Sequence, residues 1–224
     1  MKKKLNGLFT TALVLAASTV SVARPVFAEE MTPVNVADLY IKTIINHDES
    51  SVNSLNNYLR PARKIAGQTG DFASFADLVK ADKEYPDDMT KDILELFPAQ
   101  LQPALKPSVM ELMKSVLNAK NRTECKSLTS RQAKSNGGMQ TSLVKFECQV
   151  VKVPERWPAA VQRLAGSKCS AQECQKEIQN IRKFYESSAT QTWRGEFPLA
   201  REKNGSAWRN DFPREALDEI WDLI

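Results

Sequence analysis

Hydrophobic residues follow two different periods along the chain. From Val144 to Val150 they alternate with polar residues, and this period of two predicts a strand with one buried face. Asn136-Gly137 precedes that strand and predicts a tight turn, because both central residues of a type I′ turn need positive φ. The 123–154 stretch is therefore predicted to form a β-hairpin.

The two cysteines of this hairpin are expected to meet by register. Counting outward from a turn at Asn136-Gly137 places Cys125 opposite Cys148. A two-residue turn makes the two cysteines a hydrogen-bonded pair, whereas β-carbons approach more closely in non-hydrogen-bonded pairs. A four-residue loop over 135–138 keeps the register and changes that parity, so we prefer it and leave both possibilities open.

A second hairpin is predicted over residues 190–210, with Asn204-Gly205 as its turn. Trp193 and Trp208 fall on one side of it, together with Phe197 and Leu199. Pro198 places its strand at an edge of the sheet or at a bulge, because proline has no N–H to donate to a neighbouring strand.

The rest of the chain carries apolar residues at helical spacing. Thr32-Pro33 opens a first helix as N-cap and N1, and a second helix begins near Asp48 or Ser50 and is expected to stop at Pro61. Short helices are predicted between 60 and 122, and prolines are expected to begin or end them. These prolines are Pro86, Pro98, Pro103 and Pro107.

Two helices are expected after the first hairpin, and one more at the end of the chain. A short helix over 154–166 ends at Gly166, and a longer one begins at Ser170, where Glu173 completes a capping box. The last helix starts near Pro213 and runs to the end of the chain; we expect it to dock on the sheet, with a partner-binding helix as the alternative.

The first 28 residues have the pattern of a secretory signal peptide. Three lysines precede an apolar run from Leu8 to Val22, and Val26-Phe27-Ala28 resembles a cleavage site. A membrane anchor is the alternative, but the run is short and interrupted by hydroxyl residues. We expect cleavage near Ala28, a mature chain in the periplasm or secreted, and no membrane span in that mature chain.

Removal of the signal peptide changes the charge balance. It takes four of the 31 basic residues and none of the 27 acidic ones, so the mature chain has 31 − 4 = 27 of each. Such a balance gives no electrostatic reason to expect nucleic acid as a partner.

Four cysteines in an exported chain predict two disulfides. The hairpin register selects Cys125 with Cys148, which leaves Cys169 with Cys174. A zinc site is the alternative, but the Cys-x4-Cys spacing without a nearby histidine fits it poorly.

The order of elements resembles the NTF2-like superfamily, an α+β cone in which a curved sheet wraps around an N-terminal helix. The local likeness lies in ADLYIKTIINHDESSVNSLNNYL, residues 37–59, which is similar to the opening of SnoaL-like and ketosteroid-isomerase-like members. TWRGEFPLAREKNGSAWRND is similar to their closing strands. The resemblance implies a possible homodimer through the sheet.

The resemblance also implies a role for Tyr40, which matches the tyrosine that stabilises an oxyanion in the isomerases. Those enzymes place an aspartate base just after helix 2, where this chain has the basic Arg60, Arg63 and Lys64. Tyr40 is therefore expected to be a core or ligand-binding residue, and Asp38 and Asp71 are the acids available to an enzyme. The basic cluster could receive an anionic partner.

The sequence predicts one α+β domain over residues 29–224, with N-terminal helices on a curved antiparallel sheet built from two hairpins and a helical insertion around 154–188. The aromatic residues expected to face a ligand are Tyr40, Phe146, Trp193 and Trp208. The single histidine, His47, is expected at the surface, and no metal or cofactor is expected.

The expected function is non-catalytic. We expect a binding or interaction protein of the bacterial envelope that captures a small apolar ligand or a protein partner. An isomerase- or hydrolase-type enzyme using Tyr40 and an immunity or inhibitor protein against an envelope-targeted toxin are the alternatives.

Overall fold

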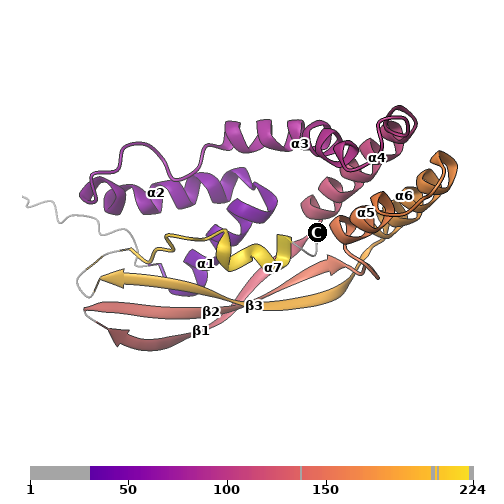
Figure 1. Ribbon diagram of the computed structural model, residues 1–224. Helices are drawn as coiled ribbons and strands as arrows, with labels where there is room; N and C mark the ends of the chain where they lie inside the picture. The colour runs from indigo at the N-terminus through magenta and orange to yellow at the C-terminus, as the bar shows by residue number, and fades with distance from the viewer. Residues whose placement is uncertain (1–30, 137, 203–204, 206, 222–224) are drawn as a thin grey trace, which may run out of the picture. The chain divides into compact units, whose positions relative to one another are not determined.

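The computed structural model describes residues 31–136, 138–202, 205 and 207–221, which form an α+β unit (Figure 1). The predicted signal peptide lies outside the described residues. The helices are α1 Pro33–Ile41, α2 Glu49–Ile65, α3 Phe75–Glu95, α4 Gln102–Asn121, α5 Trp157–Ala165, α6 Ala171–Glu186 and α7 Asp218–Trp221, with a π-helical turn η1 Lys42–Asn46 and a 3-10 turn η2 Glu215–Leu217. The strands are β1 Glu124–Asn136, β2 Met139–Val151 and β3 Ala189–Glu202.

The three strands form one antiparallel sheet in the order β1-β2-β3. This confirms the predicted α+β class, and β1–β2 is the first predicted hairpin. Of the second, the structure describes one strand and a bridge whose register agrees with a turn at 204–205. After β3 the described residues add a single bridge, in which Ala200 and Arg209 exchange two backbone hydrogen bonds of 2.8 Å. The predicted turn residue Asn204 lies outside the described residues. Pro198 lies in β3, an edge strand of this sheet, as predicted.

The β1–β2 hairpin brings the predicted cysteines together. Cys125 pairs with Cys148, and the two form a disulfide. The last pair before the turn is Asn136 with Met139, one residue later than predicted. Register shifts between Ser127 and Thr129 and between Ala133 and Asn136 offset that difference. The Cα atoms of the two cysteines lie 4.0 Å apart, near the spacing of a non-hydrogen-bonded pair.

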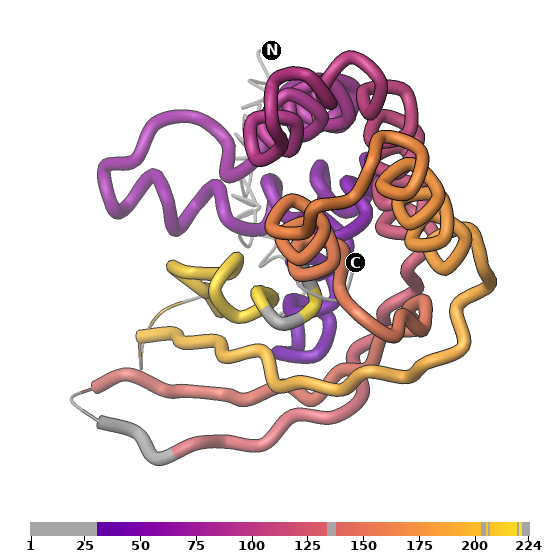
Figure 2. Tube along the Cα trace, turned by 45° about the vertical axis from the view of Figure 1, so that its right-hand side comes forward, coloured from indigo at the N-terminus to yellow at the C-terminus, as the bar shows by residue number. Residues whose placement is uncertain are grey.

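The helices cover one face of the sheet (Figures 1 and 2). On that face, alternate residues of β2 from Ser142 to Val150 are buried, as the period of two predicted. Helix α1 lies on the sheet, and Asp38 accepts the backbone N–H of Ser127 at 3.3 Å on the edge strand β1. The core therefore lies between one side of the sheet and the helices.

Three prolines that were predicted to break helices lie inside them instead. Pro61 is in α2, Pro86 in α3 and Pro107 in α4. A proline inside a helix removes one hydrogen bond and costs about 3 kcal/mol. The packing of α3 against α4 outweighs that cost, and Pro86 is itself buried in α3. The prolines that do separate elements are Pro98, between α3 and α4, and Pro103, at the start of α4.

The inserted helices follow the prediction closely. Ser170 caps α6 and Glu173 completes the capping box, while Cys169 and Cys174 form the second disulfide. In the predicted last helix, Leu217 and Ile220 are buried. The Trp221 side chain and Ile224, which fall in the same predicted helix, lie outside the described part. None of the described helices combines the length and apolar character needed to cross a bilayer.

Candidate functional site

A pocket of about 680 Å³ opens among the helices on the covered side of the sheet. Its walls come from η1, the loop before α3, α3 itself, α4, the start of α5 and the segment that leads into α7. Most of the lining is apolar: Ile44, Phe72, Ala73, Leu78, Ala81, Tyr85, Val116, Leu117, Trp157, Pro158 and Pro213. A cavity of this size, apolar with few polar groups, is typical of a small-molecule site.

His47 enters this pocket from an unusual backbone position. It follows η1 with φ 52 and ψ 37, in the left-handed region. Among the described residues other than glycine, it is the one with positive φ. Its N–H donates to Lys42 and closes the π-helical turn. Left-handed backbone and π-helical turns both occur more often at functional sites than elsewhere. The sequence prediction that His47 is a surface residue is wrong, since its side chain is 11% exposed.

His47 belongs to a partly buried cluster with the acid Asp82 and the base Lys120. Nδ1 of His47 lies 2.8 Å from Oδ2 of Asp82, and the other carboxylate oxygen of Asp82 accepts from Lys120 at 2.8 Å. The Lys120 ammonium is also 3.4 Å from Nδ1 of His47, and its side chain is 7% exposed. All three residues line the pocket. The three side chains therefore form a compact polar cluster in a pocket wall that is apolar for the most part.

The contacts of this cluster determine the proton on His47. An ionised carboxylate only accepts hydrogen bonds, so Nδ1 must be the donor to Asp82. Burial lowers the pKa of His47 and the nearby Lys120 charge lowers it further, although the hydrogen bond to Asp82 opposes them. The imidazole is therefore neutral at pH 7, with its proton on Nδ1 and a lone pair on Nε2.

Asp82 and Lys120 form the charged pair of the cluster. Burial disfavours the carboxylate of Asp82, but the hydrogen bonds from Lys120 and His47 outweigh it and leave the pKa of Asp82 lowered. Burial lowers the pKa of Lys120, and its hydrogen bond to Asp82 opposes that shift. The inner cluster thus carries one negative and one positive charge beside a neutral ring.

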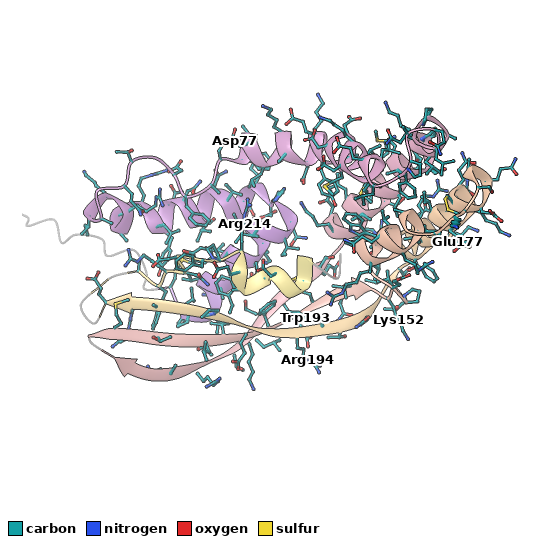
Figure 3. All side chains as sticks on the ribbon, in the orientation of Figure 1. Asp77, Lys152, Glu177, Trp193, Arg194 and Arg214 are labelled. Carbon is teal, nitrogen blue, oxygen red and sulfur yellow. A yellow bond between two sulfur atoms is a disulfide. The ribbon has the colours of Figure 1, made fainter. Side chains whose placement is uncertain are left out.

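The rim of the pocket carries three exposed charges, on Asp77, Arg214 and Asp218. Figure 3 shows Asp77 on α3 and Arg214 on the segment before α7. None of the three forms a salt bridge with another described residue. The rim therefore has an excess of one negative charge.

Thr43 also lines the pocket, four residues before His47. It is 1% exposed, and its Oγ1 finds no hydrogen-bond partner among the described residues. A buried hydroxyl without a partner costs about 1–3 kcal/mol. The wall of the pocket therefore contains a side chain that lowers the stability of the fold.

The four aromatic residues predicted to bind a ligand do not line this pocket. Tyr40, Phe146 and Trp208 are buried in the core, and Trp193 is half-buried on β3 with its ring 5.4 Å from that of Phe146 (Figure 3). Tyr40 lies behind the pocket wall, because its ring packs edge-on against the lining residue Phe72, with the ring centroids 5.3 Å apart. Their role in ligand binding stays a prediction.

The hydroxyl of Tyr40 accepts the backbone N–H of Asn210 at 3.3 Å. Burial raises the pKa of Tyr40 to about 12. The two acids considered for an enzyme are engaged elsewhere: Asp38 pairs with Lys42 at 2.7 Å, and Asp71 pairs with Arg60 at 3.0 Å.

The predicted anionic-partner cluster lies near the end of α2. Arg60 pairs with Asp71, Arg63 donates to the carbonyl of Gly70 at 3.3 Å, and Lys64 is exposed. Two of the three cations therefore hold the loop that follows α2. None of them lines the pocket.

Sequence reasoning missed the cluster of His47, Asp82 and Lys120, because Asp82 follows His47 by 35 residues in the chain and Lys120 follows it by 73. One signal was present. Lys120 follows Met113 and Val116 at helical spacing, so a cation falls on the buried face of α4. A charge on a buried face requires a partner, and Asp82 supplies it.

Among the described residues, no three His, Cys, Asp or Glu side chains gather in a way that could hold a metal ion. Comparison of the chain with models of protein families, with curated proteins and with solved structures found no match. The argument for function therefore depends on the pocket.

Proposed function

We propose that this chain is an exported, non-catalytic binding protein of the bacterial envelope that captures a small, largely apolar ligand in the pocket bounded by α3, α4 and His47. The observation that carries the proposal is the pocket of about 680 Å³ with a mostly apolar wall and one partly buried polar cluster. An apolar molecule gains roughly 25 cal/mol for each Å² that it removes from water, so such a wall supports binding.

The compartment is part of the proposal. Two disulfides, Cys125–Cys148 and Cys169–Cys174, support an oxidising location, because the cytosol keeps thiols reduced. Export through a signal peptide cleaved near Ala28 agrees with this and stays a prediction. The NTF2-like plan also stays a prediction; the placement of α1 on an antiparallel sheet supports it.

The alternatives differ in what they need from the structure. An isomerase- or hydrolase-type enzyme using Tyr40 would need a buried carboxylate facing its hydroxyl, but Asp211, the acid whose charge acts on Tyr40, is exposed. A protein partner or a toxin to be inhibited would need an exposed apolar or strongly charged patch. The outer face of the sheet carries ion pairs of both signs instead, such as Arg131 with Glu196 and Lys126 with Glu147.

The test measures binding of N-phenyl-1-naphthylamine, a neutral apolar dye that fluoresces when it leaves water. The full chain is expressed and the protein is purified from the periplasm. We expect saturable, micromolar binding that Ala81→Trp abolishes, because the indole fills the pocket. The matched control is Ala76→Trp, at an exposed alanine of α3 outside the pocket. Equal dye binding by both variants, or none by the unchanged protein, contradicts the proposal.

Native mass spectrometry of the purified protein separates the remaining classes. A small molecule that co-purifies with the unchanged protein and is lost from Ala81→Trp supports the pocket as the site. A stoichiometric protein partner that stays bound to both variants would instead favour an interaction or inhibitor role.

A further inference from the structure

We propose that the ligand of this pocket is a neutral molecule with an apolar body and a hydroxyl group, and that the hydroxyl donates a hydrogen bond to Nε2 of His47. This inference depends on the proposed function, because it specifies the ligand of the same pocket. It follows from the hydrogen bonds of the inner cluster and from the charges around it.

The first step is the state of the imidazole. Nδ1 is committed to Asp82 at 2.8 Å, so the ring offers Nε2 as its second polar atom. Nε2 makes no hydrogen bond to any described residue. In the neutral ring that atom is an acceptor. His47 lines the pocket, so a ligand hydroxyl that donates to Nε2 would supply a partner that the described residues do not.

The second step concerns the charge of the ligand. Inside the pocket the charges of Asp82 and Lys120 balance each other at 2.8 Å. At the rim, Asp77 and Asp218 outnumber Arg214. A carboxylate would have to leave water without a net positive field to receive it, and it cannot donate to Nε2.

An ammonium ion can donate, but the inner cluster offers it no net charge in return. Because Asp82 and Lys120 balance each other, an ammonium at the ring would leave water without a counter-charge beside it, and the acids of the rim are exposed to solvent, which screens them. A hydroxyl donates without charge. An ether of the same size has no proton to give, and this difference makes the proposal testable.

The test compares four probes with the same aromatic body by calorimetry at pH 7.5: 2-naphthylmethanol, its methyl ether, 2-naphthoate and 2-naphthylmethylammonium. The expected order places the alcohol first, about 3- to 10-fold tighter than the ether, which is the effect of one neutral hydrogen bond. Tightest binding by the ether, the carboxylate or the ammonium overturns the inference. Failure of all four probes and of the fluorescent dye overturns the proposed function as well.

The matched variant is His47→Asn. Asparagine tolerates the left-handed backbone at this position and its amide can still donate to Asp82. Its remaining acceptor, the amide oxygen, is bonded to Cγ and so lies closer to the backbone than Nε2 does. We expect the alcohol and the ether to bind this variant equally, at the affinity of the ether for the unchanged protein. Asp88→Asn, an exposed change on α3 away from the pocket, should keep the preference for the alcohol. A preference that survives His47→Asn contradicts the assignment.

One measurement needs no substitution. The chain has a single histidine, so a long-range ¹H–¹⁵N spectrum of the tag-free protein reports His47 alone. We expect the alcohol to shift the Nε2 resonance and the ether to leave it within the line width. Equal shifts with both probes, or a resonance pattern with the proton on Nε2, overturn the inference.

Discussion

The hydroxyl of Tyr58 on α2 accepts the backbone N–H of Trp208 at 2.7 Å, across 150 residues of sequence. Two residues further on, the hydroxyl of Tyr40 on α1 accepts the N–H of Asn210 at 3.3 Å. Two tyrosines of the first helices thus hold the segment that follows β3. That segment leads directly into the residues that close one side of the pocket.

Tyr58→Phe should destabilise the protein by about 1–2 kcal/mol, because the N–H of Trp208 loses its acceptor in a partly buried place. Tyr40→Phe should cost less, since its bond is longer. The control is Tyr85→Phe, which removes a hydroxyl that has no hydrogen bond within the described structure. Urea denaturation followed by tryptophan fluorescence gives the three values. Equal losses in all three variants would contradict the role given to the two bonds.

Thr43→Val should stabilise the protein by about 1 kcal/mol. The change keeps the shape of the side chain and removes a buried hydroxyl that lacks a partner in the described structure. Thr90→Val is the comparison, because the hydroxyl of Thr90 contacts the sulfur of Met110 at 3.9 Å and is not an orphan. Denaturant midpoints measure both. A loss of stability in Thr43→Val would mean that the hydroxyl has a partner in solution.

Removal of the hairpin disulfide should cost more than removal of the disulfide at α6. Cys125 and Cys148 are 23 residues apart, whereas Cys169 and Cys174 are five apart. The chain-entropy relation gives about 3 kcal/mol for the longer loop and about 2 kcal/mol for the shorter. Paired Cys→Ala variants and denaturant titration test the order. The opposite order would show that local strain, and not loop length, dominates.

Stability should fall between pH 7.5 and 5 in a way that depends on His47. The groups around its ring are Asp82, Lys120 and Arg214, and burial with the two cations lowers the pKa of His47 below the 6.5 of an unfolded chain. The unfolded state therefore takes up a proton first, and stability present above pH 6.5 is lost as the pH falls toward the folded pKa. The lowered pKa of Asp82 acts below pH 4, outside this window.

The measurement is the denaturant midpoint of the unchanged protein and of His47→Asn across that range. The difference between the two should shrink or reverse toward pH 5, because asparagine does not titrate. Parallel pH profiles would contradict the lowered pKa. Direct titration of the single imidazole resonance provides an independent check.

The sequence predicted the local features of this fold well, because each depends on neighbours in the chain. The Cys125–Cys148 pair follows from strand alternation, and the Ser170–Glu173 capping box follows from spacing alone. The prediction failed at Pro86, where α3 continues because Ile93 and other residues beyond the proline pack on the same neighbours. No local rule includes that tertiary energy.

The pocket could not be predicted for the same reason. Its polar cluster joins residues from η1, α3 and α4, and only the folded chain brings them together. The aromatic residues chosen from the sequence were sought inside the sheet, where Phe146 and Trp208 fill the core. The pocket lies between helices. Hydrophobic periodicity predicts which face of each helix is buried, but it does not predict which helices pack against one another.

The wall formed by Pro213, Arg214 and Asp218 has a consequence for the timing of assembly. These residues follow those of every other wall in the chain, so ribosomes add them after the rest of the cavity lining has been made. A growing polypeptide cannot close this side of the pocket before Asp218 has been made. If the proposed function holds, the ligand is enclosed only after this segment has folded onto the helices, in whichever compartment that folding takes place.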